Sequence, residues 1–565
     1  MSIGEKILVT SALPYANGPI HFGHIAGAYL PADIYVRYQK MTGSDIIYIC
    51  GSDDHGVAIT LSAEKLGRTP EEHVKINRDL IMKIFNQFKI EFDNFSATSK
   101  PNHYKISQQF FTELNDNGFI EPKTTKQLFC INCEKFLADR YVYGTCPECG
   151  YENARGDECG KCGKWLDPLD IINPKCKVCG KEPESRETTN WYLKLGDLSG
   201  KLKDWLDLKP HWKSNVTQFV KSMIDQGLES RPITRDMKWG VPVPLEEAEG
   251  KVLYVWFDAP IGYISSTMEW AEGINQPDKW KDYWYDTECK LIHFIGKDNI
   301  SFHCVVWPAM LMGQKQPFIL PENVPANEFY NLEGKQFSKS EGWYIDLDEF
   351  FDKYPSDLIR YYIASNLPEK QDSDFSWKDF QLSMNSELAD TYGNLVNRAL
   401  SFAYKHFDGK VPTPGEFNNE EKSINESVKN LVNEMGNSIE NFEFRKTAYS
   451  LMEIARQGNK FFNDSEPWKS MKTDRERGAT SVYTSLNLLK NLAVVSYPII
   501  PDTAQKLWEF LGMEGTVKEA KWPYFVDEFL KPDQLLNKPE ILFSKIEDEQ
   551  IESEIAKLGK LKSSN

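Results

Sequence analysis

Residues 6–24 read Lys-Ile-Leu-Val-Thr-Ser-Ala-Leu-Pro-Tyr-Ala-Asn-Gly-Pro-Ile-His-Phe-Gly-His, and this stretch decides the fold. The apolar, β-branched run from Ile7 to Leu13 is typical of a buried parallel strand, and Pro14 stops it. A Gly-Pro turn, two histidines and a helix reaching to about Met41 follow. The stretch therefore predicts a strand–turn–helix unit that carries both histidines at its turn.

The same alternation of strands and helices continues downstream. A second strand-like run spans residues 45–50, and a helix is expected over residues 57–66. The pattern breaks near Phe129, and strand-like runs return at residues 251–257 and 290–295. This order predicts an α/β fold, a Rossmann-like doubly wound parallel sheet that a long insertion splits.

From about Ser386 onward the apolar spacing is that of helices. The residues that form this apolar stripe are Leu388, Tyr392, Leu395, Ala399 and Phe402. We therefore expect an all-α part after the α/β domain. Residues 546–565 are rich in Glu, Lys and Ser, and we expect them to form a frayed tail.

Composition and charge exclude several classes of protein. The chain has 565 residues, of which 66 are Lys or Arg and 83 are Asp or Glu, so its formal charge is −17. We therefore do not expect the chain to bind nucleic acid through its overall charge. Any contact with nucleic acid must come from local basic or aromatic patches. The sequence has no secretory signal pattern and no apolar run long enough for a membrane span, so we expect a cytoplasmic protein.

Eleven cysteines are present, and eight of them form four Cys-x-x-Cys pairs within fifty residues. The others, Cys50, Cys289 and Cys304, are scattered, which is typical of a reducing compartment. Eight thiolates fill two tetrahedral Zn²⁺ sites and leave no position open for water, so we expect structural zinc. Nested and consecutive pairing both remain possible. The expected ligands are Cys130, Cys133, Cys146, Cys149, Cys159, Cys162, Cys176 and Cys179.

Two distant segments could hold a phosphate. His21 and His24 lie three apart where a strand meets a helix, beside free backbone N–H groups, and Gly23 allows close approach. Ser338, Lys339 and Ser340 form a glycine-flanked loop that could close over a phosphate. Taken alone, each segment is equally compatible with surface histidines or with a solvated loop.

Together, the two segments resemble the two signatures of class I aminoacyl-tRNA synthetases. Within that class the chain is most similar to the methionyl-tRNA synthetase family, and the resemblance runs from about residue 5 to about residue 545. The matching stretches are Ala12–Gly18, Gly51–Gly56, Tyr254–Tyr263 and Gly296–His303.

The chain departs from the family pattern at two places. The second signature is usually Lys-Met-Ser-Lys-Ser, but residues 336–340 read Gln-Phe-Ser-Lys-Ser. The first lysine is absent, although Lys335 stands one position earlier. At position 299 the chain has Asn where some members have Ile, and in this it resembles the archaeal and eukaryotic members of the family.

The resemblance implies an activity and its site. Methionine's carboxylate attacks the α-phosphate of ATP, giving methionyl-adenylate and pyrophosphate, and the methionyl group then passes to the 3′ end of tRNA(Met), including initiator tRNA. Neither step needs an enzyme nucleophile, and Mg²⁺ accompanies ATP. The implied catalytic residues are His21, His24 and Lys339. The implied ATP-binding residues are His21, Gly23, His24, Gly296, Asp298, Ser338 and Lys339.

The resemblance also implies a methionine pocket. Asp53 pairs with the substrate ammonium, whereas we interpret its neighbour Asp54 as the N-cap of the following helix. Aromatic walls suit a thioether. Without the resemblance, Trp256 and Tyr263 would be read as core residues. The implied pocket residues are Ala12, Leu13, Tyr15, Asp53, Trp256, Ala259, Pro260, Tyr263 and His303.

For tRNA, the resemblance implies that Asn394, Arg398 and Trp468 read the anticodon. Family members that retain only some Cys pairs favour nested zinc sites, the inner one formed by Cys146, Cys149, Cys159 and Cys162. Two alternatives remain, namely a class I synthetase for another apolar amino acid and an inactive relative that binds tRNA or zinc. We expect a monomer.

The expected parts of the chain follow in order. They are the first half of the catalytic domain (1–117), a connective insertion with two zinc knuckles (118–250), the second half of the catalytic domain (251–325), a linking region with the Ser-Lys-Ser loop (326–385), a helical anticodon-binding domain (386–545) and a tail (546–565).

Overall fold

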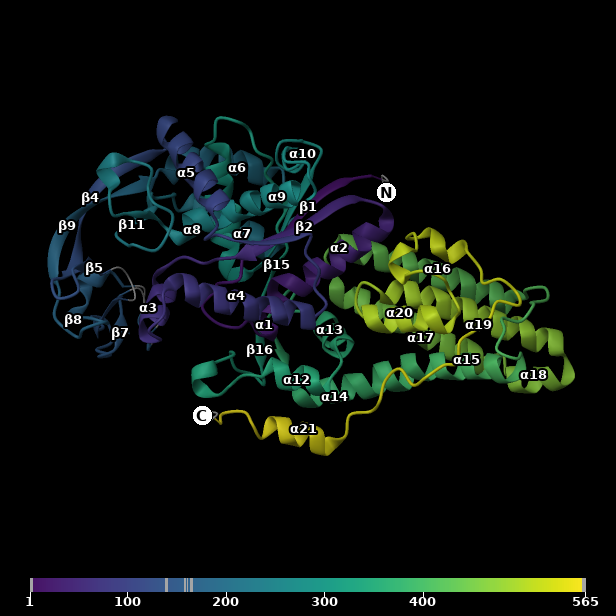
Figure 1. Cartoon of the computed structure of the whole chain (residues 1–565). Coiled ribbons are helices and arrows are strands. Elements are labelled where there is room, and N and C mark those ends of the chain that lie inside the picture. The colour runs from purple at the N-terminus through teal and green to yellow at the C-terminus, as the bar shows by residue number, and fades with distance from the viewer. Residues whose placement is uncertain (1–3, 138–140, 157–158, 160, 163–165, 561–565) are drawn as a thin grey trace.

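The computed structural model describes residues 4–137, 141–156, 159, 161–162 and 166–560. Figure 1 shows an α/β body joined to a bundle of helices formed by the C-terminal part of the chain. A long strand pair extends from the α/β body on the side away from the bundle.

A parallel sheet forms the centre of the α/β body. Its strand order is β14-β13-β1-β2-β3. The short β15 (Ala326–Asn327) pairs parallel with the last two residues of β13, Ile295 and Gly296. Val9 is paired with Tyr48 on one side and with Ile292 on the other, so β1 is a central strand, as its apolar sequence predicts. The strands are β1 (Lys6–Ser11), β2 (Asp45–Ser52), β3 (Asn94–Ala97), β13 (Lys290–Gly296) and β14 (Pro321–Asn323).

The two faces of the sheet belong to two separate cores. Ile7 and Val9 face a core that also contains residues of α2 and α4 and continues into the helical bundle. Leu8 faces the opposite core, which α5, α9 and α11 cover. Because side chains alternate along a strand, one apolar run serves both cores. The helices are α2 (Leu30–Thr42), α4 (Pro70–Gln87), α5 (Pro101–Asp116), α9 (Gly262–Gly273) and α11 (Trp307–Met312).

The strand expected over residues 251–257 is wrong. Only β12 (Val252–Leu253) is a strand, paired antiparallel with β11 (Thr234–Arg235), and α8 (Val255–Asp258) begins two residues later. Short apolar runs do not distinguish strands from buried helical turns, and this one leads directly into α9.

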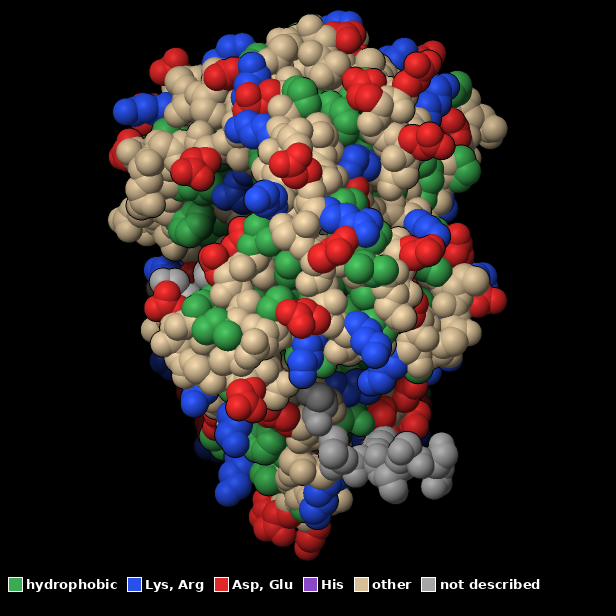
Figure 2. Space-filling model, turned by 90° about the vertical axis from the view of Figure 1, so that its left-hand side faces the viewer, with side chains coloured by type: hydrophobic (Ala, Val, Ile, Leu, Met, Phe, Trp, Pro, Cys, Tyr) green, Lys and Arg blue, Asp and Glu red, His purple; other side chains and the backbone are tan. Residues whose placement is uncertain are grey.

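The insertion between the two halves of the sheet is an arm. β4 (Ile120–Cys130) and β9 (Glu184–Leu193) pair antiparallel from end to end. The cysteines lie at the far end of this pair, with β5 (Lys135–Phe136), β6 (Val142–Thr145), β7 (Ala154–Arg155) and β8 (Ile172–Cys176). Figure 2 looks onto this side of the molecule and shows acidic and basic side chains intermixed, without a continuous basic field.

A buried ion pair joins the α/β body to the helical bundle. Arg360 of α13 (Ser356–Ser365) donates to the Asp33 carboxylate of α2 at 2.7 Å. The same guanidinium donates to the carbonyls of Pro498 and Ile499, which follow α19 (Arg475–Ser496). Arg360 and Asp33 are both fully buried, so this contact is a fixed part of the core.

The bundle itself begins inside a long helix. α14 (Trp377–Ser383), a π-helical stretch at Met384–Gly393 and α15 (Asn394–His406) form one continuous helix across the boundary expected between residues 385 and 386. The other long helices are α16 (Asn419–Glu440), α17 (Phe444–Asp464), α19 (Arg475–Ser496) and α20 (Pro501–Phe510). Across the described part of the chain, no helix has the length and apolarity that a membrane span requires.

The frayed tail expected at residues 546–565 is wrong over its described part, residues 546–560, and residues 561–565 lie outside the description. α21 (Asp548–Ile555) returns to the α/β side of the molecule, beside α12 (Leu347–Lys353) and α14 (Figure 1). Ile546 and Ile551 are buried there, and Glu554 pairs with Lys353. The expectation was wrong because the many charged residues of this segment outnumber the few apolar residues, such as Ile546 and Ile551, that pack against the body.

Candidate active site

The His21–His24 corner is held by its own imidazole nitrogens. His21 caps α1 (Phe22–His24), because the N–H of Gly23 donates to His21 Nδ1 at 3.1 Å. The N–H of His21 in turn donates to His24 Nδ1 at 3.1 Å. Burial lowers the pKa of His21 to about 2, with a smaller effect from His24. Both Nδ1 atoms act as acceptors, so each neutral ring has its proton on Nε2, where it can donate to a ligand.

Gly23 is required by packing. A Cβ at this position would lie 2.9 Å from His21 Cε1 and 3.0 Å from the carbonyl oxygen of Tyr330. The glycine therefore allows α1 to approach β16 (Tyr330–Leu332), in addition to the approach of a ligand that we expected from the sequence.

β16 leads into the loop that carries Lys339. Ser338 and Trp343 exchange backbone hydrogen bonds of 2.8 Å across the loop, and Lys339–Glu341 form a 3-10 turn. The Phe337 ring stacks on the His21 ring with a centroid separation of 4.4 Å. The two signature segments thus meet, as the resemblance implies. Nothing in the sequence pattern had singled out Phe337 as a site residue.

Lys335, the nearest lysine to the missing first position of the signature, is engaged elsewhere. Its Nζ lies 4.5 Å from the centroid of the Trp343 ring. Lys339 Nζ lies 6.0 Å from the Tyr344 ring. The two lysines therefore have different aromatic partners within one loop.

Two further residues that we expect to bind ATP, Gly296 and Asp298, lie at the carboxyl end of β13. Gly296 ends the strand, and Asp298 lies in the next turn, Lys297–Asn299. A Cβ on Gly296 would lie 2.7 Å from Asp298 Oδ1, so this close approach requires glycine. Burial raises the pKa of the Asp298 carboxyl. Lys297 pairs with Glu328 at 2.7 Å.

Asp53 stands where β2 ends. Its N–H donates to the carbonyl of Pro14 at 2.9 Å, and its own carbonyl accepts from Ala16 N–H at 2.9 Å, so the Tyr15 strand edge holds it in place. Burial, with Asp258 nearby, raises the pKa of the Asp53 carboxyl well above its usual value. A cationic ligand at this position would therefore stabilise the ionised carboxylate.

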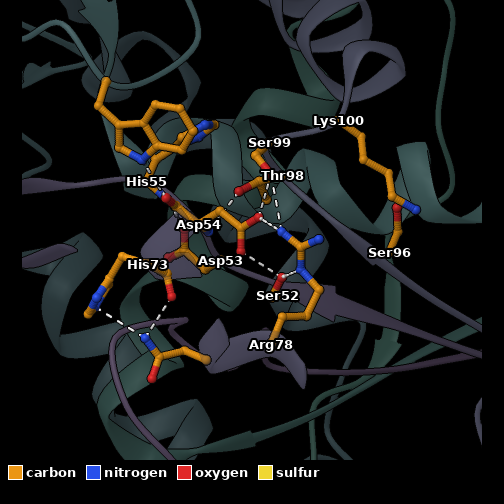
Figure 3. A network of polar contacts seen from close by, with 12 residues as sticks. Ser52, Asp53, Asp54, His55, His73, Arg78, Ser96, Thr98, Ser99 and Lys100 are labelled. Carbon is orange, nitrogen blue, oxygen red and sulfur yellow. Dashed lines mark hydrogen bonds and ion pairs between the residues drawn. The ribbon is translucent and has the colours of Figure 1, made fainter. Parts of the chain in front are cut away.

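Asp54 is not an N-cap. Figure 3 shows its carboxylate facing Arg78 of α4, and it accepts from Ser52 Oγ at 2.6 Å. α3 (Val57–Lys65) begins after Gly56, which has no side chain to cap it. The N-cap interpretation failed because Arg78 comes from another helix, 24 residues away, and spacing within one loop could not reveal it.

The expected pocket walls divide into a buried floor and an open rim. Tyr263 and His303 are buried and hydrogen bonded at 2.7 Å. Trp256 is 44% exposed and Tyr15 is 36% exposed, so Trp256 is not the core residue that composition favours. Trp256 packs edge-on against Phe302 with centroids 4.1 Å apart.

Backbone contacts position the remaining pocket residues. The Ala12 N–H donates to the Phe294 carbonyl at 3.0 Å, and Tyr29 donates to the Ala12 carbonyl at 2.8 Å. Leu13 packs closely over Gly262, where an added Cβ would lie 2.9 Å from Leu13 Cδ2. Ala259 and the buried Pro260 form the turn between α8 and α9.

A buried histidine network lies behind this pocket, and the sequence did not indicate it. His55 Nδ1 donates to Asp258 Oδ2 at 2.7 Å, and His103 Nε2 lies 3.4 Å from the same oxygen. Tyr104 and Trp239 close the outer side, with Trp239 Nε1 donating to the Asp54 carbonyl at 2.7 Å.

The eight cysteines form two groups at the far end of the arm. In each group the four Sγ atoms lie within 4.8 Å of one another. Tetrahedral zinc with Zn–S bonds of about 2.3 Å requires sulfur atoms about 3.8 Å apart, which these groups match. The grouping is nested, not consecutive. One group is Cys130, Cys133, Cys176 and Cys179, and the other is Cys146, Cys149, Cys159 and Cys162.

The three residues expected to read an anticodon lie near one end of the bundle. Arg398 Nη2 donates to Asn463 Oδ1 at 2.7 Å, and its guanidinium lies over the Phe462 ring. The ring centroids of Trp468 and Phe462 lie 6.2 Å apart, and Trp468 is 38% exposed. Asn394 is exposed one helical turn before Arg398.

Comparisons with known proteins identify the family of this chain. A family model described as "tRNA synthetases class I (M)" matches residues 7–400, so fold and site together define a class I tRNA synthetase. A second model, described as the anticodon binding domain of methionyl tRNA ligase, matches residues 411–562. The chain belongs to the methionine–tRNA ligase family.

Several relatives share nearly the whole chain. The methionine–tRNA ligase of Protochlamydia amoebophila is 50% identical over 99% of this chain and 80% of its own length. The methionine–tRNA ligase of Pyrococcus horikoshii is 46% identical over 97% of this chain and 76% of its own length. A crystal structure of Mycobacterium tuberculosis methionyl-tRNA synthetase bound by methionyl-adenylate has the same fold, with a TM-score of 0.79 at 24% identity over 96% of this chain and 100% of that one.

Proposed function

We propose that the chain activates L-methionine with ATP to methionyl-adenylate and pyrophosphate, and then transfers methionine to the 3′ end of tRNA(Met), initiator tRNA included. The observation that carries this proposal is the stacking of His21 on Phe337, which joins the His21 corner to the Lys339 loop. Both His21 and Asp53 follow parallel strands of the central sheet, β1 and β2, at their carboxyl ends. Ligands of open α/β sheets bind at this edge.

In the first step the methionine carboxylate forms a bond to the α-phosphorus, and the bond from this phosphorus to the bridging oxygen of pyrophosphate breaks. The Nε2–H groups of His21 and His24 donate to phosphate oxygens, since their Nδ1 atoms accept backbone N–H groups. Lys339 holds the leaving pyrophosphate. Mg²⁺ bound with ATP supplies further neutralisation of phosphate charge, and Gly296, Asp298 and Ser338 complete the nucleotide site.

Methionine is held at both of its ends. The Asp53 carboxylate, which burial disfavours in its ionised form, pairs with the substrate ammonium. The side chain enters the pocket of Tyr15, Trp256, Tyr263 and His303, whose rings contact its sulfur. Ala12, Leu13, Ala259 and Pro260 complete the walls.

In the second step the terminal ribose hydroxyl of tRNA attacks the methionyl carbonyl and AMP leaves. Asn394, Arg398 and Trp468 contact the anticodon, where the half-exposed Trp468 ring stacks on an unpaired base. Two structural Zn²⁺ ions, held by the nested cysteine groups, stabilise the tip of the arm.

ATP–pyrophosphate exchange, measured with each of the twenty amino acids, tests this function. Exchange that depends on methionine supports it, and charging of tRNA(Met) completes the test. Exchange with another amino acid would overturn the methionine assignment. If a zinc-loaded, folded protein supported no exchange at all, it would be an inactive relative.

A further inference from the structure

The helix that follows the His21–His24 corner is irregular at its start. A π-helical stretch, Ile25–Tyr29, begins directly after the corner and continues into α2, whose second residue is Pro31. A carbonyl accepts the N–H four residues later in an α-helix and five residues later in a π-helix. For Gly27 at the first spacing and Ala26 at the second, that N–H would belong to Pro31, and proline has none. These two buried carbonyls therefore need a donor from outside the helix.

The side chain of Asn327 supplies this donor. Its Nδ2 donates to the carbonyl of Ala26 at 3.3 Å and to the carbonyl of Gly27 at 3.1 Å. Asn327 lies on β15, 300 positions after Gly27, and is only 2% exposed. A side-chain amide carries two N–H groups, so one asparagine satisfies both of the carbonyls that Pro31 leaves without a partner.

The backbone of Asn327 lies beside a second segment of the proposed ATP site. In the parallel pairing of β15 with β13, Asn327 stands opposite Gly296, the last residue of β13. Gly296 leads into the turn that carries Asp298. Asn327 therefore links two segments, the stretch behind His21 and His24 through its side chain and the end of β13 through its backbone.

Lys213 determines which way the Asn327 amide faces. Lys213 Nζ donates to Asn327 Oδ1 at 3.2 Å and to the Ala326 carbonyl at 3.3 Å. An ammonium group only donates, so the amide oxygen must face Lys213 and the NH₂ group must face the helix carbonyls. Lys213 directly precedes α7 (Ser214–Asp225), which belongs to the insertion between the two halves of the sheet. The insertion therefore contributes a residue behind the His21–His24 corner.

We infer that Asn327, oriented by Lys213, is a positioning residue for ATP that holds the π-helical stretch next to the His21–His24 corner. This inference rests on the proposed function, because that function places the phosphates of ATP at this corner. Without the Asn327 amide, the two buried carbonyls are left unsatisfied unless the start of the helix shifts, and such a shift moves the corner with it. Asp53 and Trp256 lie on other elements, so the loss of Asn327 should weaken ATP binding more than methionine binding.

The first test compares ATP binding with methionine binding. Asn327→Asp keeps the size of the side chain and the acceptor for Lys213, but it turns a carboxylate oxygen toward the helix carbonyls. The dissociation constant for ATP with Mg²⁺, measured by calorimetry without amino acid, should rise about tenfold, while the KM for methionine in exchange stays within about twofold. Lys213→Met should raise the ATP constant about two- to fourfold, because the amide loses its orientation but keeps its donors. Lys209→Met is the matched control, since this lysine of the insertion pairs with Glu322, and both constants should stay normal.

The second test uses Pro31 to ask whether Asn327 acts through the helix carbonyls. Asn327→Leu removes every hydrogen bond of the side chain and should weaken ATP binding as Asn327→Asp does. Pro31→Ala gives the helix its own N–H at the missing position, so the double variant of Pro31→Ala with Asn327→Leu should regain about threefold or more of the lost affinity. A side chain that only filled space would not be rescued in this way. A folded double variant that binds ATP no better than Asn327→Leu would overturn the inference.

The outcomes separate this inference from the proposed function. An unmodified protein that binds ATP but shows no methionine-dependent exchange would contradict the proposed function alone. Unchanged ATP affinity in both Asn327→Asp and Lys213→Met would overturn the inference, even if methionine-dependent exchange were normal. A KM for methionine that rises as much as the ATP constant would also overturn it, since the effect would then be a general loss of structure. Circular dichroism shows which variants fold, and the partly exposed Lys213 gives the reading if the changes at the buried Asn327 prevent folding.

Discussion

The imidazole of His21 stacks on the phenyl ring of Phe337, with centroids 4.4 Å apart and planes inclined by only 13°. The two residues belong to segments more than three hundred positions apart in the sequence. Since His21 caps α1 and Phe337 lies two residues before Lys339, this stack links the two segments that we propose bind the phosphates of ATP. The position of the Lys339 loop therefore depends on a ring contact as well as on backbone pairing.

Replacing Phe337 by Ala should raise the KM for ATP and lower methionine-dependent exchange about three- to tenfold. The physical reason is the loss of a stacked ring pair, which contributes about 0.5–1.5 kcal/mol beyond its buried area. Phe337→Tyr keeps the ring and is the matched control, with near-normal kinetics expected. If both variants behave alike, the stack does not position the loop.

Lys339→Ala should reduce adenylate formation by about two to three orders of magnitude, the usual effect of removing a group that stabilises transition-state charge. Methionine binding should change little, because Asp53 and the pocket are untouched. Lys335→Ala is the control, since its Nζ lies over the Trp343 ring. A normal single-turnover rate in Lys339→Ala would remove the pyrophosphate role.

The features that sequence could predict are those carried by local pattern. The runs at residues 7–13 and 290–295 predicted β1 (Lys6–Ser11) and β13 (Lys290–Gly296), because β-branched apolar runs fit a sheet buried on both faces. The Asp54–Arg78 pair and the hydrogen bond between Tyr263 and His303 could not be predicted, because each joins elements that only the fold brings together. The aromatic run at 251–257 failed for another reason, since its hydrophobicity fits a helical turn as well as a strand.

The two cysteine groups should differ in their effect on activity. Lys135, two residues after Cys133 of the outer group, pairs with Glu64 of α3 at 3.4 Å. Cys176→Ser should therefore lose one zinc and also raise the KM for methionine, because α3 directly follows the Asp53 loop.

Cys159→Ser belongs to the inner group and serves as the matched comparison. It should lose one zinc while the KM for methionine stays within about twofold of normal, since a change away from the site is expected to have a small effect. Metal content is measured by atomic emission and KM by exchange. A KM raised equally in both variants would show that the arm responds as one unit.

Acid should destabilise the folded chain through its buried histidines. Burial lowers the folded-state pKa of His303 to about 4, and it also lowers the pKa of His293 well below its usual value. Between the unfolded value of about 6.5 and pH 4, the unfolded chain binds more protons, so the free energy of unfolding falls as pH falls. The contribution of His303 alone should reach about 3 kcal/mol at pH 4.

Urea unfolding at several pH values measures this dependence. His303→Gln should flatten the slope of the free energy of unfolding between pH 6 and 4, because it removes the buried group that takes up the proton. An unchanged slope in His303→Gln would mean that His303 is not buried in its neutral form.

Arg398→Ala should separate tRNA charging from amino acid activation. In the free protein the Arg398 guanidinium donates to Asn463 and lies over the Phe462 ring, which orients it near Trp468.

Replacing Arg398 by Ala removes this positioned donor from the helical bundle and leaves the methionine pocket untouched, so ATP–pyrophosphate exchange should stay normal. Charging of tRNA(Met) should fall about tenfold to a hundredfold, mainly in KM for tRNA, because a positioned contact to a base is worth about 1–3 kcal/mol. Asn397→Ala, an exposed neighbour on the same helix, is the control, and equal charging by the two variants would exclude Arg398 from the tRNA contact.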